Sequence, residues 1–398
     1  MGGAERVLLD LLGMVRLAQP SWPVGLLIGD DGPLADEARR IGVRTMIAPF
    51  PRELARLGDA SLSSPNAEAM AWTRFMGRAV GGSLSILAYV RQIRREIAAF
   101  APDIVHSNGF KMHLLAACAR PAHAALIWHF HDYLGSRPVT CRLIRRLKGR
   151  CSAIAAVSKS VALDIQNQLG ASVEVSMIWN AVDLARFRPD GPRLDLDAVA
   201  GLPPPRTGVV RVGLVATFAR WKGHLLFLDV LQGLVSRHNV RAYIVGGPLY
   251  QTDGSQYSIQ ELRAAAARLG MEASVGFTGF VSDPAAALRS LDIVVHASTS
   301  PEPFGLVIAE AMAAGRPVVV SDGGGVAELV RQERDALTYR ACDPYELRAQ
   351  LERLILDAAL RRRLGAAARQ AAVERFHPAR FTEQMLALYT RFHRAAAA

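Results

Sequence analysis

Short apolar runs that end in polar residues alternate with helix-like segments in both halves of the chain. In the first half these runs lie at residues 102–107, 125–132, 154–160 and 178–183. In the second half, residues 212–218 and 317–320 have the continuous apolar pattern of buried strands. This alternation predicts an α/β architecture with parallel sheets, in which ligands collect at the carboxyl ends of the strands.

The chain is too long for one ordinary hydrophobic core. Its 398 residues predict two domains. Residues 189–207, which are rich in proline, glycine and aspartate, separate the two α/β patterns. We therefore expect one domain over 1–190, a linker over 191–208 and a second domain over 209–375. Within the linker, Asp195-Leu196-Asp197 matches an Asp-x-Asp metal motif, but its place before an alanine-rich stretch favours helix capping.

A turn followed by an apolar, helix-like stretch lies at residues 300–312. Pro303 and Gly305 hold the chain in a turn before good helix formers, which predicts a helix that begins near Phe304 or Gly305. The first N–H groups of a helix lack intrahelical acceptors, and the helix dipole is positive there. The backbone of Phe304, Gly305 and Leu306 is therefore a predicted seat for a diphosphate.

Two glutamates flank this seat. Glu302 precedes it on the loop, within reach of a sugar, and Glu310 follows it on the helix. At ~1.5 Å per residue, Glu310 would lie roughly 7 to 9 Å along the axis, about the span from a pyrophosphate to its ribose hydroxyls. The alternative is that the two glutamates are a cap residue and part of a solvated face.

A lysine beside a glycine follows the strand predicted at 212–218. Residues 219–224 form the predicted turn into a helix, and Lys222-Gly223 lies within this turn. At the carboxyl end of a strand, such a lysine can place one charge on a phosphate. The alternative is an ordinary surface lysine in a loop.

These segments resemble one protein family. Residues 302–310, with the flanks 287–298 and 314–322, are similar to the Glu-x7-Glu region of the family 4 glycosyltransferases. The resemblance implies that Glu302 contacts the hydroxyls of the donor sugar, that Glu310 holds the ribose diol and that Lys222 contacts the diphosphate.

The chain also departs from the family pattern. It has Ala216-Thr217 where the family usually has Gly-Arg, so the arginine that joins the lysine on the diphosphate is absent. Arg220, in the same loop, is the candidate substitute.

Other segments resemble the family less sharply. Residues 277–281, including Phe280, are expected at the pocket for the base, and the glycine run in 321–328 either lets backbone approach the ligand or is an ordinary turn. His131-Asp132 resembles the family's His-Asp step, which implies that His131 contacts the donor sugar and phosphate across the cleft. His106 and His129 also end strands, where a histidine is more often a structural hydrogen bonder.

The two ends of the chain extend the resemblance. Gly2 and Gly3 are similar to the glycine loop of the acceptor domain, yet family members place a β-strand before that loop. We expect a truncated gene model, with about 10 to 20 further in-frame residues of apolar strand pattern. Without them, neighbouring strands would keep unpaired backbone groups. Residues 376–398 resemble the terminal helix that crosses back to the first domain of the GT-B fold.

Composition narrows the class of protein. No apolar run reaches the roughly 18 to 20 residues of a membrane span, and the four cysteines form no Cys-x-x-Cys pair, which favours a reducing cytoplasm. The net charge is +11, but only four of the 47 basic residues are lysine and no nucleic-acid motif is present. Basic residues gather in the first domain, where they would suit anionic lipid or a polyprenyl-diphosphate acceptor, or form a dispersed surface: Arg74, Arg78, Arg91, Arg94, Arg95, Arg142, Arg145, Arg146, Lys148 and Arg150.

The resemblance predicts a GT-B glycosyltransferase with two facing Rossmann-like domains, the first for the acceptor and the second for a UDP or GDP sugar. It implies retaining transfer to a glycan, lipid-linked or small-molecule acceptor, in the cytoplasm or at the inner face of the cell membrane. We expect no required metal or cofactor, since Lys222, the helix amides and Arg220 would meet the charge of the leaving group. The alternatives are a nucleotide-sugar epimerase of the same fold and a non-catalytic binding protein.

Overall fold

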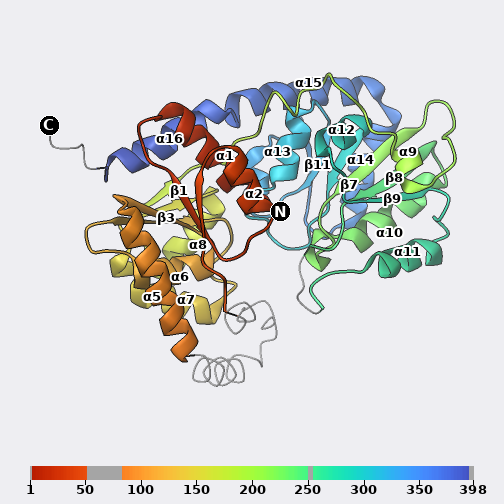
Figure 1. The fold of residues 1–398 in the computed structure, drawn as a ribbon. Helices are drawn as coiled ribbons and strands as arrows, with labels where there is room; N and C mark the ends of the chain where they lie inside the picture. The colour runs from red at the N-terminus through yellow and green to blue at the C-terminus, as the bar shows by residue number, and fades with distance from the viewer. Residues whose placement is uncertain (1, 52–82, 250–253, 394–398) are drawn as a thin grey trace. The chain divides into compact units, whose positions relative to one another are not determined.

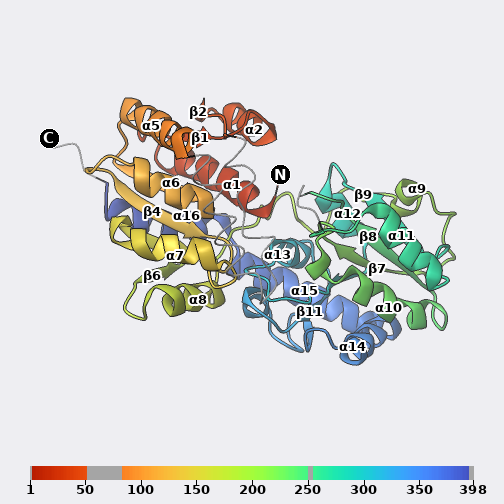
Figure 2. The same cartoon turned by 90° about the horizontal axis from the view of Figure 1, so that it is seen from below.

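The computed structural model describes residues 2–51, 83–249 and 254–393. The chain divides into two compact units, which we call the N-terminal unit (Met1–Trp179 with Ala379–Ala398) and the C-terminal unit (Asn180–Pro378). Each consists of parallel strands joined by helices (Figure 1, Figure 2). The α/β architecture predicted from the sequence is therefore confirmed.

The N-terminal unit contains two parallel sheets, in the orders β1-β2 and β3-β4-β5-β6. Its strands are β1 (Gly25–Ile28), β2 (Arg44–Ile47), β3 (Ile104–Asn108), β4 (Ala125–Phe130), β5 (Ala153–Ala156) and β6 (Val175–Met177). Its helices are α1 (Gly3–Ala18), α2 (Pro33–Arg40), α5 (Ser83–Phe100), α6 (Phe110–Ala119), α7 (Pro138–Leu147), α8 (Lys159–Leu169) and, at the carboxyl end of the chain, α16 (Pro378–Thr390).

The C-terminal unit is built on one six-stranded parallel sheet in the order β12-β11-β10-β7-β8-β9. Its strands are β7 (Val210–Val215), β8 (Val240–Val245), β9 (Val275–Gly279), β10 (Ile293–His296), β11 (Val318–Ser321) and β12 (Leu337–Tyr339). Its helices are α9 (Leu196–Ala200), α10 (His224–Val235), α11 (Ile259–Arg268), α12 (Pro284–Ser290), α13 (Leu306–Ala313), α14 (Pro344–Leu356) and α15 (Ala358–Arg375). The apolar strand pattern is continuous because both faces of this sheet are buried.

Helix α16 packs on the N-terminal unit, as the resemblance to the GT-B fold implied. Tyr389 Oη lies 2.9 Å from His106 Nδ1. Arg380 donates a hydrogen bond of 2.7 Å to the carbonyl of Trp179. Helix α16 therefore belongs to the N-terminal unit, whereas α15 belongs to the C-terminal unit.

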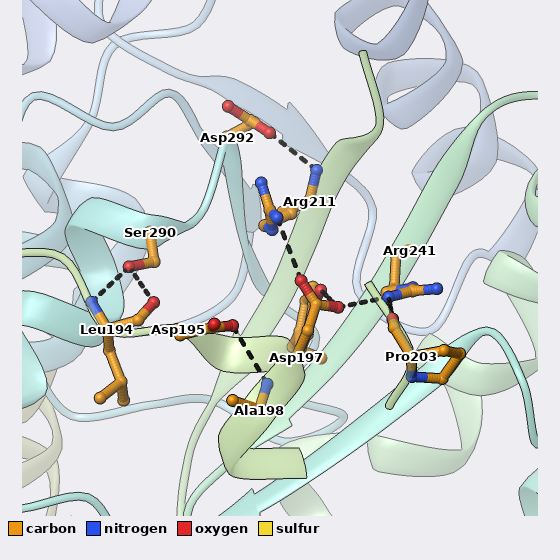
Figure 3. Close-up of polar contacts among 10 residues, drawn as sticks. Leu194, Asp195, Asp197, Ala198, Pro203, Arg211, Arg241, Ser290 and Asp292 are labelled. Atoms are coloured by element: carbon orange, nitrogen blue, oxygen red, sulfur yellow. Dashed lines mark hydrogen bonds and ion pairs between the residues drawn. The ribbon is translucent and has the colours of Figure 1, made fainter. Parts of the chain in front are cut away.

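The segment expected to be a linker, residues 191–208, contains a helix of the C-terminal unit. Asp195 accepts a hydrogen bond of 3.0 Å from the Ala198 N–H, which confirms that Asp195 caps this helix, α9. The backbone N–H of Leu194 donates to Ser290 Oγ at 2.8 Å (Figure 3). The structure draws the boundary at Asn180, ahead of the predicted one.

Asp197 has a different part in the same segment. Its side chain is buried and accepts hydrogen bonds from Arg211 (3.0 Å) and Arg241 (Figure 3). Tyr243 Oη donates a third hydrogen bond, of 2.6 Å, to the same carboxylate. Burial raises the pKa of this carboxyl, but the three donors outweigh it and leave the pKa lowered. Asp197 thus ties α9 to β7 and β8, an arrangement that sequence spacing did not reveal.

One predicted strand is wrong. Residues 178–183 form no strand, and the last strand of the N-terminal unit is Val175–Met177. The chain leaves the sheet after Met177 because it crosses there into the other unit, where the Val182 N–H donates to the carbonyl of Phe376 at 3.0 Å. An apolar run at a domain boundary has the same local pattern as a strand.

Candidate functional site

The loop that carries Lys222 packs backbone to backbone against the loop after β10. It consists of a 3-10 turn, Arg220–Lys222, between β7 and α10. Thr299 N–H donates to the carbonyl of Trp221 at 2.7 Å. Gly223 has φ +74°, and a Cβ placed on it would lie 1.8 Å from the carbonyl oxygen of Ala297. Only glycine allows this approach, which sets the position of the Lys222 backbone.

Lys222 and Glu302 form an ion pair, although they are 80 residues apart in the sequence. Lys222 Nζ lies 2.6 Å from Glu302 Oε1, and the side chains are only 18% and 11% exposed. Burial raises the pKa of Glu302, but the charge of Lys222 and the contact with His296 outweigh it and leave that pKa far below its ordinary value. Glu302 is therefore an anion at neutral pH.

Two further side chains hold the other oxygen of Glu302. His296 Nε2 lies 2.7 Å and Ser298 Oγ 3.0 Å from Glu302 Oε2. Because an ionised carboxylate only accepts hydrogen bonds, both groups are donors here. His296 Nδ1 lies 2.9 Å from Ser321 Oγ, which orients the ring. A buried polar chain thus runs from β11 through β10 to Lys222.

Sequence reasoning missed these three residues. His296 is the last residue of β10, and Ser298 follows it by two positions. A histidine at a strand end was considered only in the first half of the chain. His296 also ends a strand, six residues before Glu302, and this position could have marked it as a site residue.

Helix α13 begins at Leu306, one or two residues later than predicted. Gly305 is left-handed (φ +86°), and a Cβ on it would lie 2.5 Å from Val326 Cγ2. Among the described residues, no hydrogen-bond acceptor meets the N–H groups of Phe304, Gly305 and Leu306. The side chain of Phe304 is buried against Phe376, so Phe304 can offer a ligand only its backbone.

The remaining predicted residues of the C-terminal unit lie as follows. Glu310 is half-buried on α13, four residues after Leu306 and thus ~6 Å further along the axis. Phe280 directly follows β9 and has a 60% exposed ring beside Gly247. Arg220 is directed to α11, where it forms an ion pair of 2.9 Å with Glu261. The structure therefore places Arg220 against a carboxylate of its own, away from the Lys222–Glu302 pair.

In the N-terminal unit, Gly2 precedes α1, and its N–H donates to Glu5 at 2.7 Å. His131 belongs to a group of neighbouring histidine rings, of which His129 is buried and the other two are half-buried: the centroids of His129 and His131 are 4.1 Å apart, and those of His106 and His129 are 5.3 Å apart. Each of these three rings has a buried Nε2 without a hydrogen-bond partner among the described residues. Burial lowers the pKa of His106 to about 4, and burial together with His106 lowers that of His131 to about 3.

These histidines predict acid sensitivity. A histidine whose folded pKa lies below 6.5 makes the unfolded state bind more protons, so stability is full above pH 6.5 and falls as the pH drops toward 4. Each contributes a slope of up to ~1.4 kcal/mol per pH unit. The free energy of unfolding, measured with urea, should fall less from pH 7 to pH 5 in the double variant His106→Gln, His131→Gln than in the unmodified chain. The exposed His123→Gln is the control, and equal losses in all three would contradict the prediction.

Comparison with known proteins identifies the family. Residues 1–186 match the model described as Glycosyltransferase Family 4, and residues 206–371 match the model described as Glycosyl transferases group 1. The chain belongs to the family 4 glycosyltransferases. The resemblance noted in the sequence is confirmed.

Relatives of this glycosyltransferase differ in the extent of their match. This chain is 27% identical to the lipopolysaccharide core biosynthesis glycosyltransferase LpsD of Rhizobium meliloti. The match extends over 309 residues and covers 78% of this chain and 81% of LpsD. This chain is also 30% identical to a D-inositol 3-phosphate glycosyltransferase of Streptomyces bingchenggensis. That match covers 58% of this chain and only about half (51%) of the relative's length.

Solved structures support the GT-B fold. Anabaena Alr3699/HepE in complex with UDP has a TM-score of 0.76 at 23% identity, with 98% of this chain and 96% of that chain covered. Sucrose-phosphate synthase from Thermosynechococcus elongatus has a TM-score of 0.74 at 19% identity, with 98% and 93% covered. Both structures share the fold of this chain.

Proposed function

We propose that the chain transfers a sugar from a nucleotide diphosphate sugar to a glycan, lipid-linked or small-molecule acceptor, with retention at the anomeric carbon. The observation that carries this proposal is the Lys222–Glu302 pair just ahead of α13. One cation and the N–H groups at a helix start are suited to the charge of a leaving diphosphate. Glu310, further along α13, is the residue for the ribose diol.

Donor binding exchanges the partners of Lys222. When the diphosphate binds the ammonium group of Lys222, Glu302 loses its contact with Lys222, and one of its oxygens becomes free to accept hydrogen bonds from the sugar hydroxyls. The bond from the anomeric carbon to the diphosphate oxygen then breaks, and the acceptor oxygen bonds to the same face of the sugar. The leaving phosphate takes the proton of the acceptor hydroxyl, with His131 of the N-terminal unit as the residue that places the sugar.

A ligand screen followed by product analysis tests this function. The probes are UDP, UDP-glucose, GDP and GDP-mannose, and UDP-glucose comes first because Alr3699/HepE was solved in complex with it. A donor present at 100 times its dissociation constant should add ~2.7 kcal/mol of stability. The products should contain a glycoside of unchanged anomeric configuration. A changed sugar nucleotide formed without acceptor would instead show an epimerase, and stabilisation by none of the four would contradict the proposal.

Glu310→Gln should raise the KM for the donor and leave kcat near the unmodified value. The reason is that the ribose diol is gripped equally in the ground state and the transition state, so its loss removes uniform binding. Steady-state kinetics with a confirmed donor measures both constants. Glu374→Gln on α15 is the matched control, since Glu374 is exposed and bonded only within its own helix, to Gln370, in the contacts shown. An unchanged KM for Glu310→Gln would remove Glu310 from the site.

We also propose peripheral binding to anionic membranes through the basic residues of the N-terminal unit. Arg74 and Arg78 lie outside the described residues. Four of the others keep their charge but donate to carbonyls at helix ends: Arg94 and Arg150 to α6, and Arg145 and Lys148 to α8. No helix in the described part of the chain is long and apolar enough to cross a membrane.

Liposome sedimentation measures this binding. Binding to vesicles that contain anionic lipid should fall steeply between 0.05 and 0.5 M salt, because the Debye length is ~10 Å at 0.1 M. Vesicles of neutral lipid alone are the control. Equal binding to both kinds of vesicle would contradict the electrostatic proposal.

A further inference from the structure

The two oxygens of the Glu302 carboxylate have different partners. Oε1 lies 2.6 Å from Lys222 Nζ, whereas Oε2 lies 2.7 Å from His296 Nε2 and 3.0 Å from Ser298 Oγ. Under the proposed function the diphosphate binds Lys222, so Oε1 loses this partner while Oε2 keeps both of its own. In the donor complex, the contacts shown therefore hold the carboxylate by Oε2.

His296 is anchored at both nitrogens of its ring. Its side chain is only 7% exposed, and it ends β10, which lies between β7 and β11 in the six-stranded sheet. The second ring nitrogen, Nδ1, lies 2.9 Å from the Oγ of Ser321, which ends β11. When this hydroxyl donates to Nδ1, the ring proton is on Nε2, the atom that faces Glu302. Ser321 thus sets both the orientation of the ring and the nitrogen that donates.

Ser298 provides a less directed contact at the same oxygen. It lies in the loop after β10, and the next residue, Thr299, is bonded to the carbonyl of Trp221 in the loop that carries Lys222. A hydroxyl also rotates to suit its acceptor. Ser298 can therefore follow the carboxylate, whereas His296 fixes the carboxylate relative to the sheet.

Anchoring at Oε2 matters more once Lys222 is bound to the diphosphate. The Glu302 side chain is only 11% exposed, and burial by itself raises the pKa of its carboxyl. A buried carboxylate stays ionised only if hydrogen-bond donors replace the water that it has lost. The His296 ring supplies such a donor and keeps Oε1 in a position where it can accept from a sugar hydroxyl.

We propose that His296 is a positioning residue of the donor-sugar site. It holds Glu302 by Oε2 when the diphosphate binds Lys222, so that Oε1 accepts hydrogen bonds from the sugar hydroxyls. Ser321 acts through the same ring. Because His296 acts on the substrate only through Glu302, its effect is confined to binding of the sugar part of the donor. This inference rests on the proposed function, which it extends to residues that the family resemblance did not assign.

Isothermal titration calorimetry with UDP-glucose and with UDP tests the inference, and GDP-mannose with GDP is the second pair of probes. The ratio of the two affinities isolates the sugar part of the donor. The amide in His296→Asn is too short to reach Oε2, so the affinity for the nucleotide sugar relative to the nucleotide should fall about 10-fold, the effect of one hydrogen bond to a charged group. A glutamine amide reaches about as far as the imidazole Nε2, so His296→Gln should retain most of the ratio.

Two controls separate positioning from a general structural effect. His238→Asn removes a similar histidine–glutamate contact, 2.9 Å to Glu352, ahead of the amino end of β8, and should leave the ratio unchanged. In the Glu302→Gln background, His296→Asn should have no further effect on the ratio, since the two residues act through one contact. An unchanged ratio in His296→Asn, an equal fall in His296→Gln, or the same fall in the Glu302→Gln background would overturn the inference.

A measurement without ligand separates this inference from the proposed function. Lys222→Ala leaves Glu302 with its contacts at Oε2, as donor binding would. At pH 8, chosen to keep Glu302 ionised, His296→Asn should therefore lower the thermal midpoint more in the Lys222→Ala chain than in the unmodified chain. Losses that merely add would overturn the anchoring role. Failure of all four probes to bind the unmodified chain would contradict the proposed function, and the thermal midpoints would still decide the anchoring.

Discussion

Lys222→Ala is expected to lower kcat by a factor of roughly 100 to 1,000, the effect of removing one preorganised donor from a developing negative charge. Charge builds on the diphosphate only as the bond to the sugar breaks, so the loss appears in kcat and not in the donor KM alone. Glu302→Gln should also lower kcat, because Glu302 is the proposed contact of the sugar in the donor complex, after its 2.6 Å contact with Lys222 has been exchanged. Steady-state kinetics with a confirmed donor measures both variants.

The same substitution affects stability, and the experiment has to separate the two effects. Loss of Lys222 leaves the buried Glu302 carboxylate with His296 and Ser298, and breaking a buried pair costs about 3 to 5 kcal/mol. Kinetics should therefore be measured well below the melting temperature of each variant. Arg340→Ala, which breaks an exposed ion pair with Glu346, is the control and should change neither property much. A folded Lys222→Ala enzyme with normal kcat would remove Lys222 from the chemistry.

The pH profile gives an independent measure of the pair. The pKa of Glu302 in the folded protein lies below its ordinary value. The pair therefore stabilises the protein fully at a pH above that ordinary pKa, and this stabilisation is lost as the pH falls toward the pKa of the folded state. Without Lys222 the pKa of Glu302 should rise. Stability of the variant should therefore fall less between pH 7 and pH 3 than that of the unmodified chain.

Gly223→Ala should be strongly destabilising and should reduce kcat as well. An alanine with φ near +74° costs about 1 to 2 kcal/mol, and its Cβ would lie 1.8 Å from the carbonyl oxygen of Ala297, so the loop must also move. Movement of about 1 Å in a positioning loop can cost on the order of 100-fold in rate. The thermal midpoint and kcat measure the two effects.

Gly208→Ala is the matched control for this prediction. Gly208 has φ +76°, but a Cβ on it would meet open space, so only the backbone cost applies. If both variants lost the same stability, the close approach of Gly223 to Ala297, in the loop after β10, would not matter. If Gly223→Ala kept normal kcat, the loop would not position Lys222.

Local sequence determined the elements of the C-terminal unit. Apolar runs, Pro303 and Gly305 each act within a few residues, so β11 and the start of α13 could be predicted to within two positions, whereas the run predicted at 212–218 extends three residues past the end of β7. Lys222 and Glu302 were each singled out by their place in such a pattern. Their assigned roles in donor binding stay predictions.

Only the tertiary structure decided which side chains meet. It joined Lys222 to Glu302 across 80 residues, added His296 to the pair and turned Arg220 to Glu261. It also placed the boundary between the two units at Asn180. The physical reason is that periodicity reports whether a residue is buried, whereas its partner depends on strand order and register, which arise from contacts between segments far apart in the chain.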